Sequence, residues 1–325
     1  MKTIFWFDDD PTRKPTAKNL ESDIEYSVNF IDLKEQEVEK KLSWLFKQEE
    51  PSLILLDHSL TNAVSETFKT GSTMAAAIRE KWPQCPIVCI TGADFEYIDI
   101  RHRQAYELLI KFSEISEKHQ QIKAVADGFQ ILNGHKIGAV EEIIALLNPP
   151  KEEIEKIKKI LPKEIKENIN DQSLKLEIYR WLQEPFFSRP GFLYDKLWSA
   201  TLLGLNNSGF DKVKHVFNDA LYTGIFQDSL NPRWWKSELI SIISEKSDSY
   251  EVPWVLGRIL LPEQHEFYSQ CYASEEEFPE IVAQEDSTDD SNWYAMKMKH
   301  TLPHPKFEDM LFFEDMRIMN YDPNN

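Results

Sequence analysis

Five side chains in the first third of the sequence are of the types that can bind a divalent cation and a phosphoryl group. They are an adjacent pair of carboxylates, an isolated carboxylate, a hydroxyl and an ammonium group: Asp8, Asp9, Asp57, Thr91 and Lys111. Adjacent carboxylates repel each other, and Mg²⁺, which prefers hard oxygen ligands, would relieve that repulsion. When a metal and Lys111 neutralise the phosphoryl oxygens, a carboxylate can attack the phosphorus in line. Asp57 is the natural nucleophile, because carboxylates form acyl phosphates and Asp57 stands alone.

Each of these residues follows a short apolar segment that predicts a buried strand. The predicted strands are residues 4–7, 24–31, 52–56, 86–90 and 106–110. The predicted helices are residues 14–22, 33–48, 72–82 and 112–134, with a short helix or loop at 94–104. Strands that alternate with helices at this spacing specify a parallel sheet covered on both faces. The carboxyl ends of parallel strands share one edge of the sheet, so we expect the side chains named above to converge there.

The rest of the chain is predicted to be mainly helical. We place one domain at residues 1–134 and a mainly helical domain at residues 135–325, where apolar residues recur at helical spacing. The acidic segment 273–292 contains no Lys or Arg and is predicted to be a mobile loop. The aromatic residues of this half are interpreted as core or interface residues. The alternative is a ligand pocket among Trp198, Tyr222, Trp234 and Trp235.

The charge balance argues against nucleic acid and membranes as partners. The 325 residues include 37 Lys and Arg against 55 Asp and Glu, a net charge of −18 that repels phosphate backbones and anionic lipid. The three cysteines are odd in number, and two lie in or beside a predicted buried strand, which favours a reducing compartment. No apolar run reaches the ~18 residues of a membrane span, and the N-terminus begins with a strand instead of a signal peptide. We therefore expect a soluble, cytoplasmic protein.

In type and order, the five residues resemble the receiver domain of two-component response regulators. That family has an acidic pair after the first strand, an acceptor Asp after the third, a Ser or Thr after the fourth and a Lys after the fifth. The resemblance covers about 130 of the 325 residues. It implies a five-stranded doubly wound parallel sheet of the flavodoxin-like α/β class, with strand order 2-1-3-4-5.

The resemblance also implies a role for each residue. The implied Mg²⁺ ligands are Asp8, Asp9, Asp57 and the backbone carbonyl of Ser59. Asp57 is then the phosphoacceptor, Thr91 the switch hydroxyl and Lys111 the phosphoryl-binding lysine. The implied partner is a histidine kinase or a histidine phosphotransfer protein.

The sequence departs from the family pattern at three places. The segment between Asp57 and Gly71 is longer than usual, and it could shield the acceptor or present a partner surface. Phe112 follows the lysine where the family usually has proline. Leu108 stands where the family has an aromatic residue that swings inward on phosphorylation, and Tyr106, on the same face of the strand, is a possible substitute.

The preferred hypothesis is a signalling protein in which phosphorylation of Asp57 alters the contacts of the helical half with a protein partner. No basic helix-turn-helix follows the receiver, which argues for protein binding over transcription. Three alternatives stay open: a phosphate sink or relay member, a receiver-like adaptor that is not phosphorylated, and an effector enzyme in the C-terminal half that the receiver gates. Apart from self-phosphotransfer, enzyme activity is uncertain.

Overall fold

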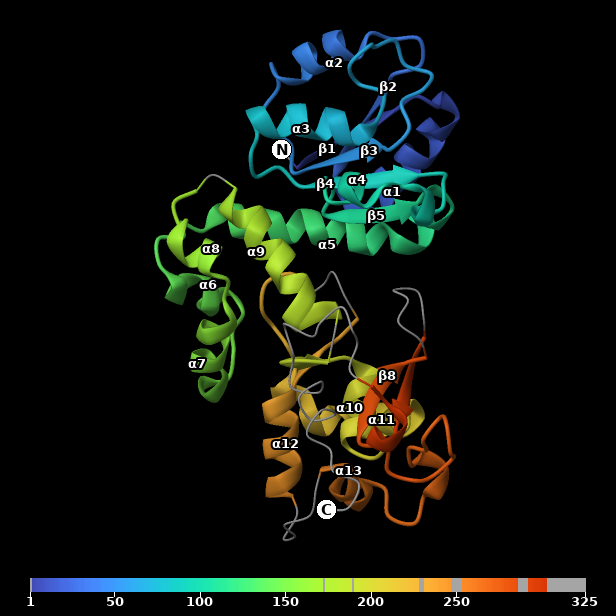
Figure 1. Cartoon of the computed structure of the whole chain (residues 1–325), viewed down its shortest axis with the longest axis vertical. Helices are drawn as coiled ribbons and strands as arrows, with labels where there is room; N and C mark the ends of the chain where they lie inside the picture. Colours follow the sequence, from blue (N-terminus) through green and yellow to red (C-terminus); the bar gives the residue numbers. More distant parts are fainter. Residues whose placement is uncertain are drawn as a thin grey trace. The chain divides into compact units, whose positions relative to one another are not determined.

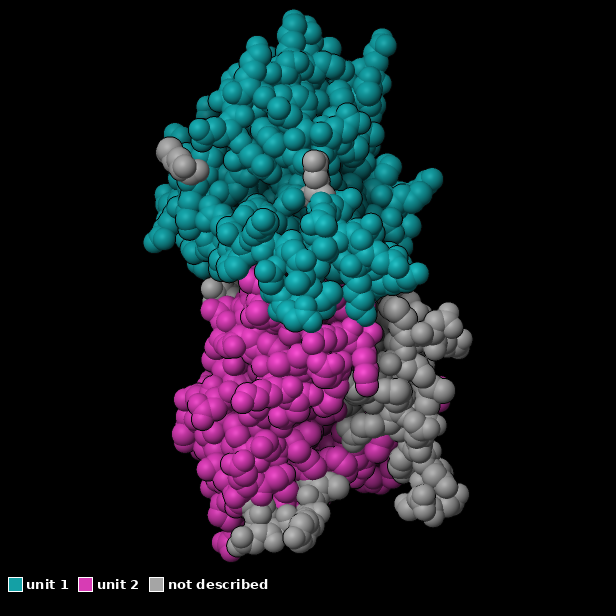
Figure 2. All heavy atoms as spheres, turned by 90° about the vertical axis from the view of Figure 1, so that its left-hand side faces the viewer, with its two compact units in different colours: residues 1–143, 162–180 teal, residues 144–161, 181–325 magenta. Residues whose placement is uncertain are grey.

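The computed structural model describes residues 2–171, 173–188, 190–227, 231–246, 253–285 and 292–302 (Figure 1). The chain divides into two compact units (Figure 2). The first consists of residues 1–143 and 162–180, and the second of residues 144–161 and 181–325. Among the described residues, no helix combines the length and the apolar character needed to cross a membrane.

The first unit is built on a five-stranded parallel sheet in the order β2-β1-β3-β4-β5, which confirms the predicted fold class. The strands are β1 (Thr3–Asp8), β2 (Ser27–Asp32), β3 (Leu53–Asp57), β4 (Ile87–Thr91) and β5 (Leu108–Lys111). Every residue of β3 and β4 is buried, because helices cover both faces of the sheet. The predicted apolar runs are therefore the strands at the centre of the sheet.

Helices cover the two faces of the sheet as a doubly wound fold requires (Figure 1). The helices of this part are α1 (Lys14–Ile24), α2 (Val38–Leu45), α3 (Gly71–Lys81), α4 (Ile100–Arg103) and α5 (Ile115–Gly134). Buried residues of α2 and α3 share a core cluster with Phe5, Phe7 and Ile54 of the sheet. On the other face α1 packs against α5.

Two later helices also belong to the first unit, although they follow residue 134. They are α8 (Lys163–Glu167) and most of α9 (Leu174–Leu182), whereas the boundary between the units falls within α6 (Val140–Leu146). Tyr179 of α9 packs on Phe129 of α5, with ring centroids 5.2 Å apart. Arg180 of α9 contacts a carboxylate oxygen of buried Glu107 at 3.2 Å. The compact unit that carries the sheet thus includes residues 162–180.

The described part of the second unit is mainly helical. Its helices include α7 (Lys151–Ile160), α10 (Lys196–Leu202), α11 (Asn207–Val213), α12 (Lys236–Glu245), α13 (Pro253–Leu256) and a π-helix at Gln183–Ser188. Two short antiparallel pairs join β6 (Leu193–Tyr194) to β7 (Trp234–Trp235) and β8 (Ile281–Gln284) to β9 (Trp293–Met296). Short 3-10 turns in the two units are Pro11–Arg13, Phe95–Tyr97, Phe112–Glu114, Lys214–Ala220, Gly257–Leu260, His265–Phe267 and Met298–His300.

The segment 273–292, predicted to be a mobile acidic loop, contains strand β8 instead at its centre. The reason is the apolar pair Ile281 and Val282, which are 3% and 7% exposed and pair with β9. The acidic residues around this pair obscured it in the charge pattern. Residues 286–291 of the predicted loop lie outside the described residues.

Candidate functional site

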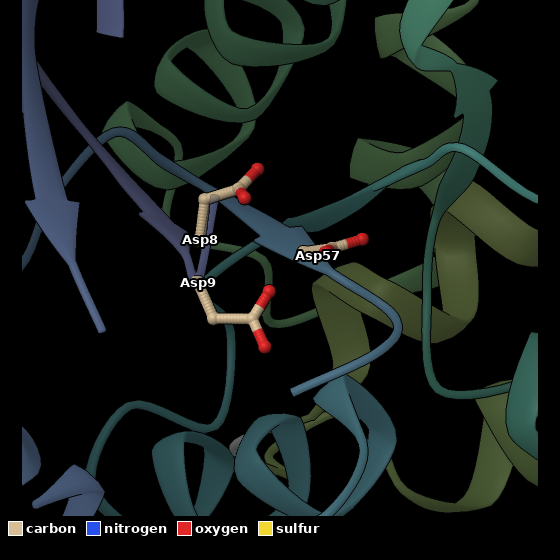
Figure 3. Close-up of side chains that lie close together, drawn as sticks. All are labelled: Asp8, Asp9 and Asp57. Atoms are coloured by element: carbon tan, nitrogen blue, oxygen red, sulfur yellow. The ribbon is translucent and has the colours of Figure 1, made fainter. Parts of the chain in front are cut away.

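Three carboxylates meet at the carboxyl edge of the sheet. Asp8 is the last residue of β1, Asp9 follows it, and Asp57 is the last residue of the neighbouring strand β3. One oxygen of each lies within 4.8 Å of the others, and all three residues are at most 4% exposed. Figure 3 shows the three side chains projecting from these two strand ends. Residues far apart in the sequence thus form one buried acidic cluster.

Asp8 and Asp9 are fixed by main-chain and side-chain donors. Asp8 Oδ1 accepts a hydrogen bond from the amide of Asp10 at 2.9 Å, and Asp8 Oδ2 accepts one from Trp6 Nε1 at 3.1 Å. Asp9 Oδ2 accepts one from the amide of Asn62 at 2.6 Å. Burial nevertheless raises the pKa of Asp8 above its ordinary value, because these donors compensate only in part for the lost hydration.

Arg13 is a member of the site that the sequence reasoning missed. Its Nη1 donates to Asp8 Oδ2 at 2.9 Å and lies 3.5 Å from Asp57 Oδ2. Burial alone would lower the pKa of Arg13, but the negative charges of Asp57 and Asp8 outweigh burial and raise it. The guanidinium carbon lies 4.7 Å from the ring centre of Phe112. The available signal was a basic residue in the loop directly after the acidic run.

Asp57 has the most perturbed pKa of the acidic cluster. Burial, together with the charge of Asp8, raises its pKa from 3.8 to about 7, although Arg13 and the backbone amide of Ser59 act in the opposite direction. A neutral-pH solution would therefore leave part of the Asp57 population protonated when no other cation is present. Ser59, predicted to supply a carbonyl to a metal, thus lies beside the Asp57 carboxylate, to which its backbone amide donates.

The hydroxyl and the ammonium group lie at the ends of the next two strands. Thr91 ends β4 and Lys111 ends β5, and the two residues are partners in the register of that strand pair. Thr91 is 2% exposed, and its Oγ1 accepts a hydrogen bond from the amide of Ala93 at 3.1 Å. Lys111 Nζ pairs with Asp94 Oδ1 at 2.6 Å, and it lies 5.7 Å from the ring centre of Phe95. The predicted residues therefore share one edge of the sheet.

The donor set fits a hard divalent cation. The oxygens of the three carboxylates are clustered and buried, and up to three negative charges face the single positive charge of Arg13. Like charges at this distance destabilise one another unless a further cation is bound or a proton is taken up. Mg²⁺ matches oxygen ligands of this kind and usually keeps several of its water ligands.

The long segment after Asp57 folds against the edge of the sheet. Its two ends meet, because Ser59 and Thr70 form an antiparallel bridge. Its middle pairs with the chain after β2 through bridges from Ala63 and Val64. Through the Asn62 amide it also holds Asp9. The segment is therefore an ordered part of the acidic site.

Tyr106 lies close to the carboxyl end of β3. Its side chain is buried, and a hydrogen bond of 3.3 Å joins its hydroxyl to His58 Nδ1. The close approach of the neighbouring chain requires Gly71, because a Cβ there would lie 2.2 Å from the carbonyl oxygen of Asp57 and 2.8 Å from the Tyr106 hydroxyl. Leu108 is the first residue of β5 and is only partly buried. Tyr106, two residues before the start of β5, is thus buried and turned inward.

The aromatic residues suggested as an alternative pocket are core residues of the second unit. Trp198, Tyr222, Trp234 and Trp235 are 2–6% exposed. Trp234 packs edge-on against Phe210, and Trp235 packs against Tyr222. Their exposed area is too small to line a sizeable binding site.

Comparison with known proteins finds similarity only among solved structures. No family model matches the chain, and no curated protein matches it. A response regulator from Thermotoga maritima in complex with Mg²⁺ and BeF is 22% identical and covers 38% of this chain and 99% of its own, with a TM-score of 0.30. The N-terminal domain of a response regulator with sensory box and GGDEF domains from Carboxydothermus hydrogenoformans is 20% identical and covers 41% and 100%, with a TM-score of 0.33. A receiver domain protein from Clostridium thermocellum is 12% identical and covers 40% and 94%, with a TM-score of 0.31. The N-terminal part of the chain resembles these receiver domains in fold.

Proposed function

We propose that this protein is a two-component-type signalling protein in which Asp57 accepts a phosphoryl group from a phosphohistidine donor. The observation that carries the proposal is the edge of the sheet, where a buried acidic cluster lies beside the strand ends that hold Thr91 and Lys111. A structural role alone gives no reason to collect three carboxylates beside one arginine in a buried place, because the repulsion that Arg13 leaves uncompensated costs free energy.

The proposed reaction is a transfer between two side chains. An oxygen of the Asp57 carboxylate forms a bond to phosphorus, the phosphorus–nitrogen bond of the donor breaks, and the imidazole nitrogen keeps the bonding electron pair. A bound Mg²⁺ supplies positive charge to the phosphoryl oxygens. Lys111 supplies further positive charge once it leaves Asp94, and the Thr91 hydroxyl donates to a phosphoryl oxygen. The residues proposed to hold the metal are Asp8, Asp9, Asp57 and the Ser59 carbonyl.

The raised pKa of Asp57 gives the cation a second role in this proposal. Asp57 is a nucleophile only when ionised, and in the protein alone its pKa is about 7. A divalent cation beside the carboxylate favours the ionised form and lowers that pKa. At neutral pH, Mg²⁺ is therefore expected to increase the ionised fraction of Asp57 and with it the rate of phosphorylation.

The output of the protein is proposed to be a protein contact made by the mainly helical remainder, residues 135–325. The partners are then a histidine kinase or phosphotransfer protein on the input side and an unknown protein on the output side. The net charge of −18 disfavours nucleic acid in that role and favours solubility. The proposed cytoplasmic location rests on the three cysteines, whose number and placement suit reduced thiols. Removal of phosphoryl groups from a kinase, as a sink or relay, requires the same chemistry at Asp57.

Binding of beryllofluoride, a mimic of the acyl phosphate, tests the proposal. The full-length protein is titrated with BeF₃⁻ in the presence and absence of Mg²⁺, and the same titrations are made with Asp57→Asn. Binding that requires both Mg²⁺ and Asp57 is the expected result. Equal binding by the two proteins, or binding by neither, would contradict phosphoacceptor chemistry and leave an adaptor that is not phosphorylated.

A further inference from the structure

We propose that Arg13 is a built-in counter-cation of the acidic cluster, which lowers the affinity of the site for Mg²⁺ and stabilises the site without metal. The inference rests on the proposed function, because it concerns the same metal site. It goes beyond that function by assigning a role to a residue that neither the receiver pattern nor the sequence spacing singled out.

The first argument is the position of the guanidinium group between two of the three carboxylates. One nitrogen, Nη1, contacts Asp8 Oδ2 at 2.9 Å and lies 3.5 Å from Asp57 Oδ2. Arg13 Nε lies 3.8 Å from the carboxylate of Asp10, which is not one of the three cluster residues. The side chain is 13% exposed, so water screens these interactions only weakly.

The second argument is that the surroundings hold the guanidinium in this place. Phe112 supports it from one side, with 4.7 Å between the guanidinium carbon and the ring centre. Gly92 lies beside it as well, since a Cβ there would be at ordinary contact distance, 3.4 Å, from Arg13 Nη2. The backbone is fixed by the turn Pro11–Arg13, in which the Thr12 amide donates to the Asp10 side chain and the Arg13 amide donates to the Asp10 carbonyl. Phe112, at the position where proline was expected, thus has a specific contact with Arg13.

The third argument is charge balance. When Asp8, Asp9 and Asp57 are all ionised, they and Arg13 carry a net charge of −2, so a bound Mg²⁺ brings these groups to zero. The more exposed Asp10 is not counted. Without Arg13 the same carboxylates carry −3 and attract Mg²⁺ more strongly. Replacement of Arg13 by an uncharged residue also leaves Asp8 and Asp57 without this cation when no metal is present. Loss of the Arg13 charge should therefore tighten Mg²⁺ binding and make folding depend more on Mg²⁺.

The test is calorimetric titration of the full-length protein with MgCl₂. Arg13→Gln removes the charge but keeps an amide donor, whereas Arg13→Lys keeps the charge. The control Arg101→Met removes an exposed arginine that pairs with Asp99, away from the cluster. We expect Arg13→Gln to bind Mg²⁺ roughly ten- to a hundredfold more tightly than the wild type. We expect Arg13→Lys and Arg101→Met to stay within about threefold of the wild type.

Each other outcome has a defined meaning. If the wild type binds Mg²⁺ and Arg13→Gln binds it with the same or a weaker affinity, the inference is overturned and the proposed function stays intact. An equal gain in Arg13→Lys overturns it too, because the charge is then not the cause. Binding by Arg13→Gln alone supports the counter-cation and refutes a working metal site in the natural protein. Binding by neither overturns both proposals.

A second measurement covers a variant that does not fold without metal. The helical circular dichroism of Arg13→Gln is followed while MgCl₂ is added, and the wild type is followed in parallel. Recovery of the helical signal at millimolar Mg²⁺ or below supports the inference. A variant that stays unfolded at all Mg²⁺ concentrations overturns it, since Arg13 would then be needed for folding in the metal-bound state as well.

Discussion

Replacing Asp57, the proposed acceptor, by Asn should stabilise the first unit when no metal is present. The folded-state pKa of about 7 lies above the ordinary 3.8, so the folded protein holds a proton that the unfolded chain releases between these pH values. The contribution of Asp57 to wild-type stability is therefore highest below about pH 4, falls as the pH rises to about 7, and then stays level. At 1.36 kcal/mol per pKa unit, this difference corresponds to about 4 kcal/mol.

Asn resembles the protonated carboxyl group in shape and carries no charge at any pH. We therefore expect Asp57→Asn to match the wild type at pH 4 and to exceed it by up to about 4 kcal/mol at pH 8 in EDTA. Saturating Mg²⁺ should reduce or reverse the difference, because it stabilises the ionised carboxylate of the wild type alone.

Hydrogen exchange suits the measurement, since the chain has two units and a single unfolding transition cannot be assumed. Opening free energies are taken from peptides that cover β1 and β3, after correction for the pH dependence of intrinsic exchange. Asp23→Asn, which alters an exposed carboxylate of α1, is the control. A stability gain that is equal at pH 4 and pH 8, or no gain at pH 8, would refute the reasoning about Asp57.

Three further substitutions test other contacts of the first unit. Glu107→Gln should cost about 3 kcal/mol and speed hydrogen exchange in α9, because buried Glu107 pairs with arginines of α3 and α9. Gly71→Ala should lower the opening free energy of β3 peptides by about 2 to 3 kcal/mol, because the added Cβ would lie 2.2 Å from a main-chain oxygen. Gly134→Ala, with no atom within 4 Å of the added Cβ, should change it by less than about 1 kcal/mol. Tyr106→Phe should lower the opening free energy of β5 peptides by about 1 kcal/mol, because it removes the hydrogen bond to His58. An unchanged exchange rate, an equal effect of the two glycine variants, or a neutral Tyr106→Phe would contradict the respective contact.

The sheet could be predicted from the sequence because its central strands are buried on both faces and read as unbroken apolar runs. Strand ends were less certain. The second strand was predicted from residue 24, but Ile24 ends α1 and the chain turns at Glu25, which has a positive φ of 59°. Period-two alternation therefore ran through a helix end. The meeting of Asp8, Asp9 and Asp57 followed from the parallel order alone, because that order places all carboxyl ends together.

Other features depend on contacts that no local pattern contains. Within the first unit, residues 162–180 contact the part that carries the sheet through individual side chains. Tyr179 packs on Phe129, and Arg180 pairs with Glu107. The place of Arg13 depends on how the loop after β1 folds back over the strand ends. Neither has a period or a motif, so neither could be read from spacing.

One departure from the receiver pattern contacts the acidic site through Arg13. Phe112 replaces the usual proline, and its ring supports the guanidinium of Arg13, which in turn contacts Asp8 and lies near Asp57. Proline would offer that guanidinium no aromatic face. A cation held there compensates part of the carboxylate charge at all times, while the pKa of Asp57 stays near neutrality. Because the remaining charge is what a divalent cation would neutralise, we expect the residues around Arg13 to set how much Mg²⁺ the proposed site needs before Asp57 is fully ionised.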